Sequence, residues 1–444
     1  MSKESMELIP HDGISVTSIA RGLLGISAIV VIAYLLSNNK KNIDWKTIGI
    51  GLLSQIIIAV GVIKVDAVKI FFEKIGEAFL AIVVFTNEGT KVLFGELANS
   101  DKYGAIFAFQ ILPVIIFFSA LTSVLYYYGI IQKVVKAMAW LLTKLLNISG
   151  QESLAVVGNI FLGQTEAPLL VKGYLNKMNR SEYFLLMTGG MATVAGSVLA
   201  AYIGFLGGDD PVQRVEVAKN LIIASVMAAP GAIVISKLIY PQVETINKDF
   251  KVNEEITGDN LLTAITNGTR DGIKMAVNVG AMLLVFLALI ALVNGILFQG
   301  ADLFGINDWI KNNTVYESLS LELILGYIFA PLMWLIGIAK EDITLMGQLL
   351  GVKLAASEFV AYIELANLKD LSSMVHLTYQ KSVIMATIML CGFANFASIG
   401  IQVAGIGILA PKKYKLLTEL GLKAMIAGTL VSLLSATMVG MILG

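Results

Sequence analysis

An amide, a hydroxyl and a carboxylate stand side by side at Gln164, Thr165 and Glu166, inside otherwise apolar sequence. Gly163 precedes them and Pro168 follows, so we expect a helix to break here and to free backbone groups for a cavity. A carboxylate at membrane depth costs about 3 kcal/mol, so such a residue indicates a functional site. We interpret this stretch as the tip of a hairpin that enters the membrane and turns back.

Three further breaks in apolar sequence carry polar side chains, namely Thr193, the pair Ser357 and Glu358, and Asn395 with Ser398. Carboxylates accept hydrogen bonds from hydroxyls, and amides both donate and accept. No Arg or Lys lies in any of the four breaks, and no basic partner for either carboxylate is visible in its own segment. The set therefore favours a neutral, hydroxyl-rich and heterocyclic solute over an anion. Asn and Thr oxygens with freed carbonyls also suit sodium.

The composition excludes a soluble globule. Of 444 residues, 57% are hydrophobic and 14% are charged, and the mean hydropathy is +0.79, which predicts an all-α polytopic membrane protein. Apolar runs of about 20 residues suit helices rather than the strands of a barrel. One cysteine and two distant histidines, His11 and His376, give no disulfide and no metal centre. The net charge of zero gives no indication of a nucleic-acid partner.

The elements that hold these breaks repeat in two halves. After N-terminal spans and an amphipathic interfacial helix, each half has a scaffold span, a short helix, a hairpin, a broken span and a last span. We place the domains at 1–103, 104–240 (first repeat), 241–269 (polar connector) and 270–444 (second repeat). A hairpin returns to the side it left, so each half crosses the membrane three times and the second half is inverted. Inverted repeats with discontinuous helices are typical of secondary transporters.

The hairpins and broken spans have definite expected positions. We expect re-entrant hairpins over 151–175 and 342–368, and broken spans over 182–206 and 379–409. Lys and Arg gather in the loops on one side, beginning with Lys40 and Lys41, which indicates the cytoplasmic face. With two initial spans, the chain would cross the cytoplasmic membrane eight times and have both termini outside.

Four stretches, at 163–170, 271–283, 357–362 and 392–399, resemble the concentrative nucleoside transporter family, in its bacterial eight-crossing type. The likeness covers roughly residues 100–440. It implies a nucleoside substrate, a homotrimer in the lipid membrane and one substrate path per protomer.

The resemblance also implies a role for individual side chains. The residues that would face the nucleobase are Gln164, Thr165 and Val198, with Glu166 reaching it through water and Phe393 lying nearby. The residues that would hold the ribose hydroxyls are Glu358, Asn395 and Ser398. A sodium ion would be bound by the Asn159 side chain, the Leu162 carbonyl, the Thr193 hydroxyl and the Val194 carbonyl. The family often has Asn where this chain has Ser357, and Ser where it has Thr193, which keeps the hydroxyl.

We therefore expect a cation-coupled symporter that imports nucleosides by alternating access, with sodium as the coupling ion and no cofactor. The alternative is a proton-coupled nucleoside symporter with Glu166 or Glu358 as the proton carrier. An intramembrane hydrolase would need a nucleophile–base pair, and both histidines lie away from the breaks, so we expect no enzyme. A channel is a third possibility, which saturable uptake against a gradient would exclude.

Overall fold

The computed structural model describes residues 7–11, 13–98, 106–208, 210–248 and 260–444. Within these residues the named elements are all helices. Two N-terminal spans come first, α1 (Val16–Leu35) and α2 (Trp45–Lys64). Each begins at a side-chain cap, because Ser15 accepts from the Ser18 backbone and Asp44 accepts from the first turn of α2.

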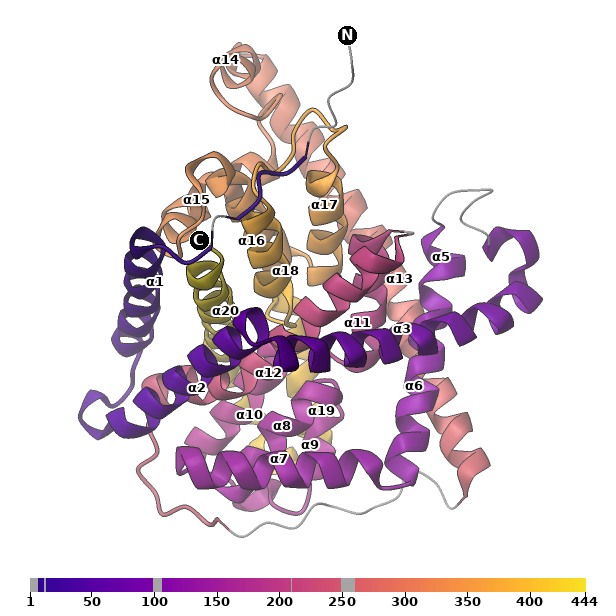
Figure 1. The fold of residues 1–444 in the computed structure, drawn as a ribbon, viewed down its shortest axis with the longest axis vertical. Helices are drawn as coiled ribbons and strands as arrows, with labels where there is room; N and C mark the ends of the chain where they lie inside the picture. Colours follow the sequence, from indigo (N-terminus) through magenta and orange to yellow (C-terminus); the bar gives the residue numbers. More distant parts are fainter. Residues whose placement is uncertain (1–6, 12, 99–105, 209, 249–259) are drawn as a thin grey trace.

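Two long helices lie across the direction of the others. α3 (Asp66–Phe94) and α7 (Ile130–Leu146) run sideways in Figure 1, whereas α6 (Leu112–Tyr127), which follows the short α5 (Phe107–Gln110), runs upright between them. Charged side chains alternate with apolar ones along both helices, with acidic residues and lysines in α3 and lysines in α7. This is the arrangement expected of amphipathic helices that lie on a membrane surface.

The first repeat continues with a helix pair, a broken span and a long helix. These are α8 (Gly150–Phe161) with α9 (Ala167–Leu170), α10 (Arg180–Ala192) with α11 (Gly196–Gly207), and α12 (Pro211–Ile239). The return arm of the hairpin is short, since after α9 the chain continues in turns and a single 3₁₀ turn, Leu175–Lys177.

The second repeat has the same order. It comprises α13 (Leu261–Asp302), α14 (Ile306–Asn313), α15 (Leu321–Leu335), α16 (Ile343–Ala355), α17 (Glu358–Lys369), α18 (Gln380–Leu390), α19 (Phe396–Leu409) and α20 (Tyr414–Leu443). The pair α16 and α17 forms the second hairpin, and α18 and α19 form the second broken span. The predicted boundary at 103/104 and part of the connector at 241–269 lie outside the described residues.

The two halves pack into each other. α6 lies along α13, α10 and α12 pack against α20, and α11 packs against α17. The core surrounds the hairpins and broken spans, and α8 and α10 are buried along nearly their whole length. By contrast, few residues of α13 are buried, and in Figure 1 this helix runs from the top of the molecule to the lower right, where α6 lies beside it. Polar groups in the core are therefore shielded by a shell of apolar helices.

The first described residues lie close to the C-terminal end of α20 and to the start of α18. The Gly13 amide donates to the Leu443 carbonyl at 2.7 Å, and Ile9 pairs with the residues that lead into α18. Seven helices, counting α10 with α11 as one, are long and apolar enough to cross a membrane among the described residues. The predicted eighth crossing corresponds to α18 and α19, two shorter apolar helices in series.

Candidate substrate and ion site

The tip of the first hairpin is built by local sequence. Ser149 and Glu152 form a capping box that starts α8, and the helix ends at Phe161, before Leu162, whose backbone is extended. Pro168 in the first turn of α9 suits a helix start, because that position needs no donor. A Cβ at Gly158 would lie 2.5 Å from the Leu170 side chain, so glycine lets the two arms close. The polar triplet, residues 164–166, lies between these arms.

The first broken span faces this tip. α10 ends at Ala192, Thr193 is extended (φ −117°, ψ 170°), and α11 begins at Gly196. A Cβ at Gly189 would lie 3.2 Å from the side-chain nitrogen of Asn159, and a Cβ at Gly163 would lie 3.2 Å from the Cβ atom of Ala195. The glycines therefore allow the hairpin and the broken span to approach closely.

Four predicted sodium ligands lie where these elements meet. Asn159 is fully buried, and neither atom of its amide has a hydrogen-bond partner in the described part of the chain. The Thr193 hydroxyl donates to the Gly189 carbonyl at 2.9 Å, which leaves its oxygen free to accept a cation. The Leu162 and Val194 carbonyls stand at the two helix breaks. A buried polar side chain without partners is costly, and neutral oxygens at broken helices suit sodium.

The second hairpin and second broken span are joined by a carboxylate. Ser357 caps α17 by accepting from the Val360 amide at 3.4 Å, and Asn395 caps α19 by accepting from the Ser398 amide at 2.8 Å. The Asn395 side chain also donates to Glu358 Oε2 at 2.7 Å. Asn395 thus fixes the start of its own helix and the carboxylate of the opposite hairpin.

The two halves of the chain meet through one further hydrogen bond. The Gln164 amide on the first hairpin donates to the Ser398 hydroxyl on α19 at 3.1 Å. Four of the predicted substrate residues therefore form a continuous chain in the order Gln164, Ser398, Asn395 and Glu358, and all four are buried. Their remaining lone pairs and hydroxyl proton can accept and donate further hydrogen bonds.

The other predicted substrate residues lie close by without joining this chain. Val198 is buried on α11, and Phe393 is buried in the second break, where its amide donates to the Thr193 carbonyl at 3.3 Å. Thr165 is exposed and lies against Gly405 of α19. Glu166 is half-buried, and its backbone amide donates to the Gly163 carbonyl at 3.0 Å. Among the described residues, Thr165 and Glu166 are not hydrogen-bonded to the four-residue chain.

One expectation was wrong, because Glu358 has a basic neighbour. Lys353 of α16 is fully buried, donates to the Met389 carbonyl at 2.8 Å and interacts electrostatically with Glu358. Lys353 lies one turn before the break, so the sequence search of the break itself missed it. Its position in a helix that also carries Leu349 and Leu350 was the available signal, since a lysine in such a run needs a buried partner.

Two more buried polar side chains were also missed. The Tyr202 hydroxyl on α11 donates to Glu358 Oε1 at 3.1 Å. The Gln402 amide on α19 donates to the Met187 carbonyl at 3.1 Å, and a Cβ at Gly190 would lie 2.5 Å from the Gln402 nitrogen. Both contacts join the first repeat to the second, which sequence spacing does not reveal.

Comparison with known proteins identifies the family. Three family models match the chain, described as the sodium-dependent nucleoside transporter N-terminus over residues 24–97, nucleoside recognition over 108–209, and the sodium-dependent nucleoside transporter C-terminus over 220–440. The chain is also 41% identical to an uncharacterised transporter of Haemophilus influenzae, an alignment that covers 96% of this chain and 98% of that protein. The chain belongs to the concentrative nucleoside transporter family.

Other relatives of this transporter carry functional names. It is 38% identical to the sodium/nucleoside cotransporter 1 of Rattus norvegicus, covering 94% of this chain and 63% of the rat protein. Its fold matches the solved structure of CNTnw in an inward-facing substrate-bound state with a TM-score of 0.87 and 36% identity, covering 96% and 99% of the two chains. These matches confirm the predicted all-helical membrane fold and exclude the enzyme reading.

Proposed function

We propose that this transporter imports nucleosides through the site formed by the two hairpins and two broken spans. The observation that carries the proposal is the buried chain of Gln164, Ser398, Asn395 and Glu358, which joins both repeats. Glu358 and Asn395 offer acceptors and a donor to ribose hydroxyls, whereas Gln164 offers an amide to a nucleobase. Val198 and Phe393 supply apolar surface beside them, and Thr165 and Glu166 complete the base end of the site. The names of the related cotransporters support this substrate class.

We propose sodium as the coupling ion, held by Asn159, Thr193 and the carbonyls of Leu162 and Val194. The unpartnered, fully buried amide of Asn159 supports this assignment, because a bound cation would satisfy its oxygen. Ion binding would order the hairpin tip that carries Gln164 and thereby tighten nucleoside binding, and the coupling is reciprocal. Proton coupling through Glu166 or Glu358 is the second candidate, since both are intramembrane carboxylates.

We propose that the protein crosses the cytoplasmic membrane eight times with both termini outside. Lys40 and Lys41 follow α1 and support a cytoplasmic position for that loop. The hairpins and broken spans would move as a unit against a scaffold that contains α6 and α13. We also propose a homotrimer, as the family resemblance implies. Large apolar side chains are exposed along α13, and an apolar groove of about 670 Å³ lies between α3, α6 and α13.

Uptake of labelled uridine into proteoliposomes tests the function. An inward sodium gradient, an equal proton gradient and no gradient are compared, with adenosine as a second substrate. Accumulation only with sodium is the expected result. Accumulation only with protons would reassign the coupling to a carboxylate, and the lack of uptake of any nucleoside under every gradient would overturn the proposed substrate class.

A further inference from the structure

One helix extends from the proposed ion site to the proposed ribose site. α11 begins at Gly196, two residues after Val194, which with Thr193 is a proposed sodium ligand in the break. Val198, in the first turn of the helix, lies on the proposed base side of the site. Tyr202 follows one turn later, so Val198 and Tyr202 lie on the same face of α11.

Tyr202 holds one oxygen of the carboxylate in the opposite repeat. Its hydroxyl donates to Glu358 Oε1 at 3.1 Å, whereas Asn395 donates to Oε2 at 2.7 Å. The carboxylate is therefore fixed from two helices, α11 and α19, and its remaining lone pairs have defined directions. Hydrogen bonds to an ionised group are stronger than neutral ones, so the loss of either donor changes the orientation of the carboxylate.

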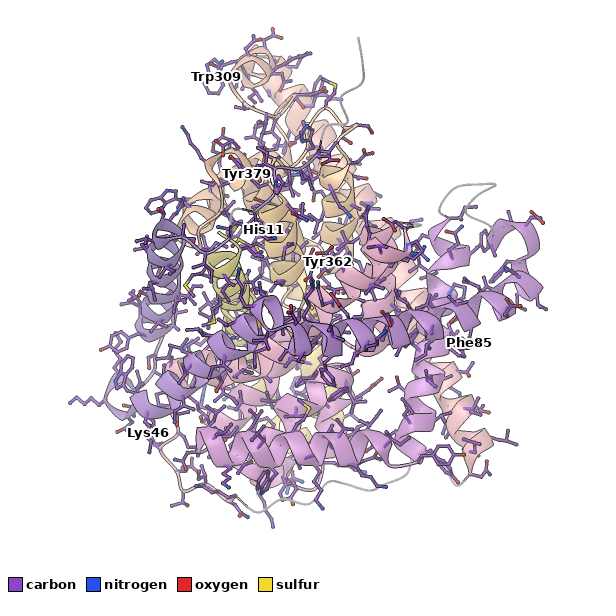
Figure 2. All side chains as sticks on the ribbon, viewed as in Figure 1. His11, Lys46, Phe85, Trp309, Tyr362 and Tyr379 are labelled. Carbon is purple, nitrogen blue, oxygen red and sulfur yellow. The ribbon has the colours of Figure 1, made fainter. Side chains whose placement is uncertain are left out.

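The ring of Tyr202 is as well fixed as its hydroxyl. The side chain is fully buried, lies 4.2 Å from the ring of Tyr362 in a stacked arrangement, and meets Phe359 edge-on at 5.1 Å. Tyr362 and Phe359 belong to α17, the helix that Glu358 begins. Figure 2 places Tyr362 near the centre of the molecule. Aromatic pairs in these geometries are favourable beyond their buried area, so α11 and α17 are tightly docked around Glu358.

We propose that Tyr202 is a positioning residue for ribose recognition. When sodium orders the residues that precede α11, this helix in turn fixes the orientation of the Glu358 carboxylate. The helix is the physical link, because its first turn follows the ion ligands and its second turn carries the hydroxyl that orients the carboxylate. This inference rests on the proposed function. It adds a residue that contacts the ribose only through Glu358, and a route by which sodium tightens nucleoside binding.

The structure supplies a matched control for removing this hydroxyl. Tyr362 is equally buried and shares the same ring stack, but its hydroxyl donates to the Thr387 carbonyl at 2.7 Å and not to Glu358. Tyr202→Phe and Tyr362→Phe therefore remove the same atom from the same aromatic cluster. A defect that comes from weaker packing or a buried unsatisfied group is expected in both variants, whereas a defect in orienting Glu358 is expected only in the first.

The test uses the full chain in lipid nanodiscs. It measures dissociation constants at low and high sodium for uridine and for 2′,3′-dideoxyuridine, which lacks the 2′- and 3′-hydroxyls of the ribose. For Tyr202→Phe we expect uridine binding to weaken about tenfold or more, because a misoriented Glu358 loses a charged hydrogen bond to a ribose hydroxyl. Dideoxyuridine binding should change less than about twofold. We also expect the effect of sodium on uridine binding to shrink. Tyr362→Phe should leave the ratio between the two ligands and the sodium effect unchanged.

Four results would count against the proposal, in different ways. Equal losses for both ligands, or identical behaviour of the two variants, would make Tyr202 a packing residue only. An unchanged sodium effect in Tyr202→Phe would overturn the role of α11 as the link. If the wild-type protein with sodium bound no nucleoside, the proposed function itself would fail, and this inference with it.

Discussion

Gln164 and Ser398 are 234 positions apart in the chain, yet the amide of the first donates to the hydroxyl of the second at 3.1 Å. Each belongs to a different repeat, and each stands at a break in its helix. The bond partly satisfies both side chains in the absence of a ligand, which lowers the cost of holding them buried. A nucleoside that binds here must compete with this bond or use the lone pairs that it leaves.

The carboxylate of Glu358 is expected to dominate ribose binding. Glu358→Gln should reduce uridine uptake by roughly 10- to 150-fold, because hydrogen bonds to a charged group contribute about 1.5–3 kcal/mol. Glu364→Gln on the same helix is the control, since Glu364 accepts from Gln348 within the hairpin. Initial uptake rates in proteoliposomes measure the effect. Full activity in Glu358→Gln would remove this residue from the binding site.

The hydroxyl of Thr193 is expected to serve the ion more than the substrate. Thr193→Ala should raise the sodium concentration for half-maximal uptake by about tenfold, while the Michaelis constant for uridine at saturating sodium changes less than about threefold. Thr437→Ala is the matched control, because Thr437 is also buried and donates to the carbonyl four residues earlier in its helix. An unchanged sodium dependence in Thr193→Ala would exclude it as a ligand.

Asn159 provides a stability test that needs no transport. Its buried amide lacks partners among the described residues, so Asn159→Ala should cost little stability in sodium-free buffer, since it removes an unsatisfied polar group. The wild-type protein should melt at a higher temperature when sodium is added, because a ligand stabilises the state it binds. The variant should lose this increase. Choline chloride at equal ionic strength is the control, and a retained sodium effect would place the ion elsewhere.

A buried ion pair anchors the base of the first hairpin. Lys237 of α12 pairs with Glu152 of α8 and donates to Ser181 of α10 at 2.9 Å. Lys237→Met should destabilise the protein by about 3–5 kcal/mol, because it leaves a carboxylate buried without its counter-charge. Adding Glu152→Gln should restore much of this loss, since the amide oxygen keeps the capping bond to the Ser149 backbone.

The exposed pair Arg180 and Glu419, at 3.0 Å, is the reference for these measurements. Its removal by Arg180→Ala should cost less than about 1 kcal/mol, because solvent screens such pairs. Thermal melting of the purified variants in detergent ranks their stabilities. If Lys237→Met were no less stable than Arg180→Ala, the buried pair would not anchor the hairpin.

The positions of the helix breaks could be predicted from sequence because their causes are local. Gly163 and Pro168 interrupt one apolar run, and the broken spans are interrupted where Thr193 and Asn395 take extended backbone conformations. Apolar runs of membrane length are equally local. The expected broken spans at 182–206 and 379–409 therefore agree closely with α10–α11 and α18–α19.

Contacts between the repeats were decided only by the tertiary structure. Nothing in the spacing of Tyr202, Lys353 and Gln402 tells which distant group each one meets, because a buried polar side chain is satisfied by whatever the packing brings near it. The structure brings Tyr202 to Glu358 and Gln402 to the Met187 carbonyl. The segments that break inside the membrane follow from neighbouring residues alone, since backbone and glycine–proline chemistry are local. The packing of one repeat against the other sets how the buried polar groups pair, since that depends on three-dimensional proximity.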